Sequence, residues 1–194
     1  MKSARQLLMA MALWLSAGAF GFSLLLGYEN TPGSGGSVPT QWPGQTHIVR
    51  PGTGFALIMF AHPKCPCVRA SIGELNRLLA HCQGKVCATV LFFQPKEMPW
   101  NWVRGPLWDS AASVPGVSVQ ADPDGAEARR FGAQTSGLTL LYDAQGHLLF
   151  QGGITPARGH SGDNAGAAAI VSIVSGTATT INQTSAFGCG LLDF

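Results

Sequence analysis

Two cysteines separated by a single residue, Cys65 and Cys67, are the residues of this sequence best suited to chemistry. They follow an apolar run, Phe55–Ala61, and they precede a segment with helical spacing. The N–H groups at a helix N-terminus favour a thiolate over a thiol, and the thiolate is the form that exchanges disulfides or binds soft metals. The sequence therefore predicts sulfur chemistry at a junction between a strand and a helix.

The immediate neighbours of the pair support a reactive thiolate. Pro66 suits the first helical position, which would make Cys65 the N-cap. We expect positive charge from Lys64, Arg69 and His62 to lower the thiol pKa values. A disulfide that closes over one residue is strained and hence easily reduced, so the pair should donate disulfides. The alternative is a buried structural pair with inert thiols.

The other three cysteines fall in two places. Cys82 and Cys87 flank a turn at residues 83–86, and we expect them to form a structural disulfide in an oxidising compartment, the alternative being two free core cysteines. Cys189 lies beyond the last expected helix. It either folds back as a third sulfur near the pair or is an exposed tail residue.

Two histidines could complete a metal site. His62 is three residues from Cys65, and His160 lies in a glycine-rich loop. A set of Cys65, Cys67, His160 and Cys189 would suit Cu(I) or Zn. The alternative for His160 is ordinary hydrogen bonding, and we expect no metal if exchange is the function.

The region between the second and third expected strands, residues 95–115, is rich in Trp and Pro. Trp100, Trp102 and Trp108 could form a groove for an extended partner or an ordinary lid over the sheet. The acidic residues that follow, Asp122, Asp124 and Glu127, are interpreted as a helix cap and first-turn acids rather than metal ligands.

An uncharged apolar segment near the start predicts a membrane span. Residues 7–26 number about 20, enough to cross a hydrocarbon core ~30 Å thick. Lys2 and Arg5 precede it, so the positive-inside rule keeps the N-terminus in the cytoplasm and places the domain outside it, in the periplasm of a Gram-negative cell. The alternative is a cleaved signal peptide, with small residues at 17–19.

Charge excludes one class of partner. Two of the 12 Lys and Arg residues precede the span, which leaves 10 basic against 10 acidic side chains in residues 28–194. We therefore expect no nucleic-acid binding. The expected organisation is a membrane anchor at 1–28, a flexible tether rich in Gly, Pro and Ser at 29–53, one domain at 54–176 and a tail at 177–194.

Apolar periodicity and turn residues predict alternating elements in the domain. Strands are expected at 55–61, 86–93 and 117–121, with a hairpin of 138–142 and 147–151; helices are expected at 66–82, 122–131 and 163–174. This order implies an α/β fold with a mixed sheet covered on both faces.

This order, with paired cysteines after the first strand of the domain, resembles the thioredoxin-like superfamily. The insertion before residues 122–132 is similar to those of the peroxiredoxin and membrane-anchored cytochrome-maturation branches, and residues 150–165 resemble RedB-like proteins. The resemblance implies a thioredoxin-like three-layer sandwich. It also implies exchange with protein thiols or disulfides outside the cytoplasm, without a cofactor.

The sequence departs from the family at two positions. Aligned on the family's Cys-x-x-Cys motif, Lys64 takes the place of the first cysteine and Cys67 that of the resolving cysteine. The family's cis-proline before the hairpin is replaced by Gly137, which weakens the simple reductase interpretation and leaves room for a ligand. Copper-delivering relatives of the synthesis-of-cytochrome-oxidase type have a His before the hairpin, whereas His160 follows it here.

Three functions are compatible with these patterns. The first is membrane-tethered thiol–disulfide exchange by Cys65 and Cys67, with Cys65 as the nucleophile by its expected place at the N-cap. The second is a copper-binding or copper-transfer module that uses the same pair. The third is a non-catalytic thioredoxin-like interaction domain.

Overall fold

A five-stranded sheet forms the centre of this protein, whose computed structural model describes residues 2–192. Its strands are β1 Phe55–Ala61, β2 Val86–Gln94, β3 Val117–Pro123, β4 Thr139–Tyr142 and β5 Leu148–Gly152. The order across the sheet is β3-β2-β1-β4-β5. The first three strands are parallel, while β4 is antiparallel to both β1 and β5. The mixed sheet predicted from the sequence is confirmed.

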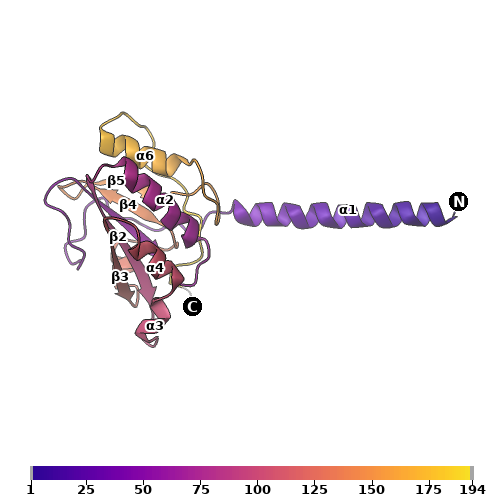
Figure 1. Ribbon diagram of the computed structural model, residues 1–194, viewed down its shortest axis with the longest axis horizontal. Coiled ribbons are helices and arrows are strands. Elements are labelled where there is room, and N and C mark those ends of the chain that lie inside the picture. The colour runs from indigo at the N-terminus through magenta and orange to yellow at the C-terminus, as the bar shows by residue number, and fades with distance from the viewer. Residues whose placement is uncertain (1, 193–194) are drawn as a thin grey trace.

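The helices are α1 Lys2–Glu29, α2 Val68–His81, α3 Trp100–Val103, α4 Pro106–Ala112, α5 Ala126–Arg130 and α6 Ala165–Ser175. Helices α2, α4 and α6 pack on one face of the sheet (Figure 1), and α5 packs on the other. The side chains of β1 alternate between two cores, as the pleat of a strand requires. Leu57 and Met59 pack with α2, α4 and α6, whereas Ile58 and Phe60 pack with α5.

The start of α2 differs from the expectation. Cys67, not Cys65, is the N-cap, and Pro66 precedes the helix. Residues 65–67 form tight turns, in which the Val68 N–H donates to the Cys65 carbonyl oxygen at 3.3 Å. The expected N-cap is therefore wrong by two residues, although both cysteines still lie where β1 passes into α2.

The segment expected to be a flexible tether, residues 29–53, lies against the domain instead. The ring of Trp42 contacts those of Phe131 and Tyr142, with centroids 5.3 and 5.2 Å apart. The Tyr142 hydroxyl donates to the Pro39 carbonyl oxygen at 3.0 Å, and Ile48 is buried. A Gly- and Pro-rich composition excludes helix here, but it does not exclude packing.

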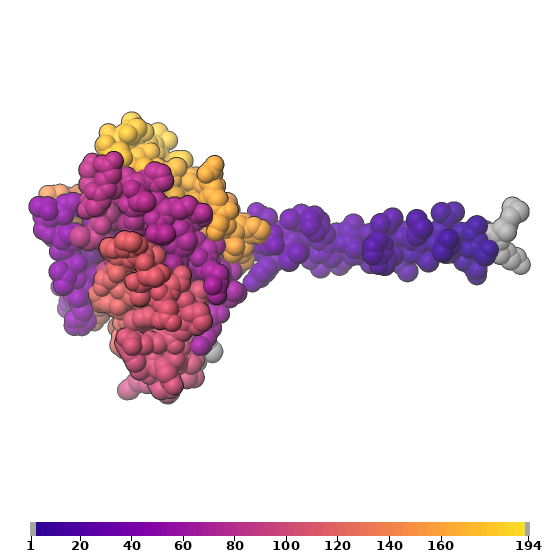
Figure 2. Space-filling model, viewed as in Figure 1, coloured from indigo at the N-terminus to yellow at the C-terminus, as the bar shows by residue number. Residues whose placement is uncertain are grey.

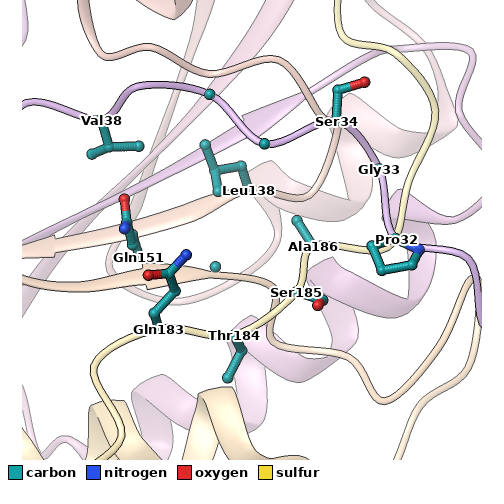
Figure 3. Close-up of a pocket in the computed structure, with 13 residues that line it drawn as sticks. Pro32, Gly33, Ser34, Val38, Leu138, Gln151, Gln183, Thr184, Ser185 and Ala186 are labelled. Atoms are coloured by element: carbon teal, nitrogen blue, oxygen red, sulfur yellow. The ribbon is translucent and has the colours of Figure 1, made fainter.

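The tail after α6 also returns to the domain. The Gln151 N–H donates to Asn182 at 3.0 Å and the Thr184 N–H donates to Gln151 at 3.1 Å, so the tail first runs beside β5. It then passes the segment around Pro32, where the two lengths of chain border a shallow pocket (Figure 3). The expected tail ends at 194, but its last two residues lie outside the described range.

Helix α1 projects away from this domain (Figures 1 and 2). Its stretch Ser3–Glu29 is long and apolar enough to cross a membrane, and its most apolar part is fully exposed. An apolar helix without protein around it needs an apolar environment. This agrees with either an anchor or a signal sequence.

Candidate functional site

Three cysteine sulfurs meet at the end of β1. The Sγ atoms of Cys65 and Cys189 are 3.1 Å apart, and those of Cys65, Cys67 and Cys189 all lie within 4.8 Å of one another. The turn between β1 and α2 supplies the first two sulfurs, and the tail supplies the third. Of the two alternatives for Cys189, the structure shows the one in which it folds back.

Backbone pairing holds the tail in this position. The Ser136 N–H donates to the Cys189 carbonyl oxygen at 2.9 Å, and Thr135 and Gly190 form an antiparallel bridge. A Cβ at Gly188 would lie 1.9 Å from the Ser136 carbonyl oxygen, so only glycine allows this approach. The tail therefore lies as a strand-like segment along the loop before β4, paired with it through one antiparallel bridge.

That loop is itself fixed to the end of β1. Gly137, at the position expected for the family's proline, has φ +93° and donates its N–H to the Phe60 carbonyl oxygen at 2.7 Å. A Cβ there would lie 3.1 Å from the Ser71 hydroxyl oxygen. The Ser136 hydroxyl accepts a hydrogen bond from the His62 N–H at 2.8 Å. Gly137 thus has a structural role next to the cysteines.

Hydrogen bonds stabilise Cys65 as a thiolate. Burial raises the pKa of the Cys65 thiol, but hydrogen bonds from the Cys189 thiol, from the N–H groups of Cys189 and Cys67 and from the Ser136 hydroxyl bring it below the ordinary value. Each favours the charged form. The lowered pKa favours the thiolate at Cys65 over its two neighbours, and the tail supplies much of this stabilisation.

The other two thiols are shifted the opposite way. Burial, the negative charge of Cys65 and the hydrogen bond with it raise the pKa of Cys67. Burial, the hydrogen bond to Cys65 and the charges of both neighbours raise the pKa of Cys189 to about 12. Among the three thiols, the pKa is lowered only at Cys65, so the first proton lost from the cluster comes from Cys65 and its two neighbours keep theirs longer.

Arg158 is a site residue that the sequence interpretation missed. Its charge lowers the pKa values of Cys67 and Cys189, opposing the effect of burial. Its guanidinium donates to the carbonyl oxygens of Gly188 and, at 3.1 Å, Thr31, and it lies 5.0 Å from the ring centroid of Tyr28. The loop of Arg158 also contains His160, so the sequence indicated the right loop but not the right residue.

The three cations expected to act on the pair are arranged differently. The Lys64 ammonium lies 5.4 Å from the centroid of the Trp102 ring, and Arg69 is exposed. His62 is buried; its Nδ1 accepts the Lys64 N–H at 3.1 Å, and its ring meets the edge of Trp102. His62 and Lys64 therefore connect the turn to the aromatic insertion.

His160 is not brought to the sulfurs. Its Nε2 lies 3.4 Å from a carboxylate oxygen of Glu29, the last residue of α1, and its side chain is 53% exposed. The expected ligand set therefore loses its histidine, because the loop turns this side chain toward the base of α1. Three thiols remain as a set that suits a soft metal.

The expected Cys82–Cys87 disulfide is not formed. All five cysteines, which lie within the described residues, are free thiols. Cys82 is buried beside Val86 and Ala88, whereas Cys87 is exposed. Successive residues of a strand point to opposite faces, so Cys87 points away from the core that Cys82 enters.

The aromatic insertion packs as a lid. Trp108 is buried against Phe92, and Trp100 is 49% exposed and contacts Trp108 edge to face. Asp122 accepts the N–H groups of Glu127 and Ala128 at 2.8 and 2.9 Å, so its side chain caps the helix, but it does so from β3, because α5 begins at Ala126 and not at the expected residue 122. Of the two alternatives for the tryptophans, a groove for a partner and a lid over the sheet, this packing agrees with the lid.

Solved structures share this architecture. A hypothetical protein from Sinorhizobium meliloti 1021 matches with a TM-score of 0.58 and 18% identity, over 84% of this chain and 94% of its own. An uncharacterized conserved protein from Geobacillus kaustophilus matches with a TM-score of 0.59 and 17% identity, over 83% and 91%. A secreted disulfide oxidoreductase of Mycobacterium tuberculosis, homologous to DsbE of E. coli, matches with a TM-score of 0.44 and 16% identity, over 64% and 82%.

The protein has the predicted α/β fold, with a mixed five-stranded sheet and a long apolar N-terminal helix. No family model and no curated protein matches the chain. Function must therefore be argued from the site, because one fold carries many activities.

Proposed function

We propose that this protein is a membrane-tethered thiol–disulfide exchange protein, in which Cys65 is the attacking thiolate. The observation that carries the proposal is the hydrogen-bonded position of the Cys65 sulfur, 3.1 Å from a second thiol and within 4.8 Å of a third. Exchange requires a thiolate and a second thiol that can displace the partner from the mixed disulfide. The lowered pKa of Cys65 and the nearby thiols of Cys189 and Cys67 support these two roles.

The direction proposed is donation of a disulfide to protein thiols. Stabilising the Cys65 thiolate stabilises the reduced protein, and that raises the reduction potential. We expect a potential above the value of about −270 mV typical of thioredoxin. Equilibrating the full-length protein in detergent with glutathione buffers measures it, and a value at or below that of thioredoxin would exclude an oxidant.

Mixed disulfides test the role of Cys65 directly. The test uses a protein in which Cys87→Ser has removed the exposed thiol outside the cluster. Replacing both potential resolving thiols in it, by Cys67→Ser and Cys189→Ser together, should leave Cys65 joined to one glutathione after treatment with oxidised glutathione. Adding Cys65→Ser to this variant should abolish the adduct. If the adduct forms equally well without Cys65, the assignment of the nucleophile is wrong.

The proposed location is outside the cytoplasm, with α1 retained as an anchor. The support is the apolar stretch Ser3–Glu29 together with Arg5 before its uncharged part. A phosphatase reporter that is active only outside the cytoplasm, fused after Phe194, should be active. An inactive reporter would contradict the proposed location. We also propose that the protein is related to RedB-like proteins, because residues 150–165 resemble them.

Copper binding is the second candidate, and the three sulfurs favour it. A metal bonded to sulfur at ~2.3 Å allows two ligand sulfurs to lie up to ~4.6 Å apart, close to the spacing here. Thiolates are the ligands that Cu(I) prefers. Retention of about one Cu(I) per protein in a chelator competition, lost with Cys189→Ser but kept with His160→Ala, would favour copper over exchange.

A further inference from the structure

The C-terminal tail presents Cys189 to the site through contacts on both sides of this residue. Before it, the carbonyl oxygen of Gly188 accepts a hydrogen bond from the Arg158 guanidinium. After it, the Leu191 N–H donates to the Gln134 carbonyl oxygen at 2.8 Å, and the Leu191 side chain is only 1% exposed. The position of the Cys189 sulfur is therefore determined by an ordered strand.

This strand brings two thiols close to bonding distance. A disulfide requires an S–S distance of about 2.05 Å, so the sulfurs of Cys65 and Cys189 need to approach by only ~1 Å. A bond between Cys65 and Cys67 would instead close a small ring across the turn that leads into α2, with the strain that such a ring carries. Geometry therefore favours the distant partner over the neighbouring one.

We propose that Cys189, carried on the C-terminal tail, is the disulfide partner of Cys65 in the redox cycle. This inference rests on the proposed exchange function and specifies which thiols perform it. The tail then acts as a strand that is covalently attached beside the loop before β4 in the oxidised protein. In the reduced protein, non-covalent contacts hold it there, among them hydrogen bonds and the apolar packing of Leu191 and Leu192.

The oxidation balances as two exchanges with a disulfide such as oxidised glutathione. The Cys65 thiolate attacks one glutathione sulfur, forms a mixed disulfide and releases the other glutathione as a thiolate. Cys189 then loses its proton to solvent and attacks the Cys65 sulfur, releasing the second glutathione. One disulfide has been reduced to two thiols, and two protein thiols have been oxidised to one disulfide.

The third thiol has a defined place in this scheme. Cys67 lies within 4.8 Å of both other sulfurs. Its thiolate can attack Cys65 in the Cys65–Cys189 bond, which forms Cys65–Cys67 and releases Cys189 without a net change in oxidation state. Movement of the disulfide would thus free the tail from its covalent attachment.

Disulfide mapping of the full-length protein tests the assignment. The wild-type protein, Cys67→Ser and Cys189→Ser are each oxidised by glutathione in detergent, blocked with an alkylating agent, digested and analysed by mass spectrometry. We expect a peptide containing Cys65 linked to a peptide containing Cys189 in the wild type and in Cys67→Ser. In Cys189→Ser we expect a bond within the peptide that carries Cys65 and Cys67, formed at least tenfold more slowly, or a persistent glutathione adduct.

The outcomes distinguish failure of this inference from failure of the proposed exchange function. If oxidised Cys67→Ser, in which the disulfide cannot move to residue 67, carries alkylated Cys189 and a glutathione adduct on Cys65, Cys189 is not the partner, although exchange stands. The same conclusion follows if Cys189→Ser oxidises at the wild-type rate. If no variant forms a disulfide or an adduct, exchange itself is wrong and the inference fails with it.

Discussion

The guanidinium of Arg158 donates a hydrogen bond to the carbonyl oxygen of Gly188, the residue before Cys189. The same group reaches Thr31 and lies over the ring of Tyr28 at the base of α1. Arg158 thus joins the apolar helix, the tail and the cysteine cluster. The site is held next to the end of α1, and for an anchored protein that means next to the membrane.

Arg158→Gln should loosen the tail. The variant loses the charged hydrogen bond to Gly188, so we expect the free energy of unfolding to fall by about 1–2 kcal/mol and the alkylation of Cys189 in the reduced protein to accelerate several-fold. Arg129→Gln is the matched control, because Arg129 also donates to a carbonyl oxygen, that of Asp124 on the other face of the sheet. Equal acceleration in both variants would contradict a specific role for Arg158.

The hydrogen bond from Cys189 should control the reactivity of Cys65. Cys189→Ala removes this donor and should raise the pKa of Cys65, whereas Cys189→Ser keeps a hydroxyl donor and should raise it less. Both variants equally lack the third sulfur, so the difference isolates the hydrogen bond. The measurement is the rate of Cys65 alkylation against pH, followed by mass spectrometry. Identical profiles in the two variants would show that the donor has no effect.

Much of the fold follows from local pattern, and the site follows only in part. The continuous apolar run of β1 and the apolar spacing in α2 were sufficient to predict a buried strand followed by a helix, with Cys65 and Cys67 at their junction. Cys189 could not be placed, because it is 124 positions from Cys65 and its approach depends on backbone pairing with Ser136. Sequence spacing carries no information on such a contact.

The two wrong predictions, the Cys82–Cys87 disulfide and the flexible tether, also arise from contacts that sequence spacing does not report. Cys82 and Cys87 are close in sequence, but the direction of a side chain at a strand start depends on register, and register is a property of the sheet. Residues 29–53 have the composition of a linker, yet Trp42 and Ile48 supply enough apolar surface to pack them down. Two apolar side chains that contact the core can therefore outweigh the composition around them.

Cys82 and Cys87 should respond differently to substitution because they are not bonded. Cys82→Ser places a hydroxyl in the core and should cost about 1–3 kcal/mol in the free energy of unfolding, while Cys87→Ser should change it by no more than ~0.5 kcal/mol. Urea titration measures both under oxidising conditions. If both variants lost the same stability and a reductant abolished the loss, Cys82 and Cys87 would be shown to form a disulfide.

The stability of the reduced protein should fall at alkaline pH through Cys189. Its folded pKa of about 12 lies above the unfolded value of ~8.5, so its stabilising contribution is complete below about pH 8.5 and is lost as pH rises toward 12. Cys65 acts in the opposite sense, because its lowered pKa stabilises the fold above ~8.5 and that contribution is lost as pH falls.

Urea unfolding of the reduced wild type and of Cys189→Ala, compared between about pH 8.5 and 10.5, tests this sign. The wild type should lose stability more steeply with pH than the variant. Tyr142, whose pKa burial also raises, contributes equally to both proteins and cancels in the comparison. Parallel curves would mean that Cys189 does not retain its proton in the folded state.

Gly188→Ala should separate the tail from the cluster without removing any thiol. Its Cβ would lie 1.9 Å from the Ser136 carbonyl oxygen, so the strand that carries Cys189 has to shift away from the loop before β4. We expect a loss of about 1–3 kcal/mol in the free energy of unfolding, a higher pKa of Cys65 and formation of the Cys65–Cys189 bond slowed at least tenfold. The control is Gly73→Ala in α2, where a Cβ meets nothing within 4 Å, and there we expect a gain of ~0.5–1 kcal/mol and unchanged disulfide formation. Stopped-flow oxidation by glutathione with mass-spectrometric mapping measures the rates, and a wild-type rate in Gly188→Ala would mean that docking of the tail does not control the chemistry of Cys65.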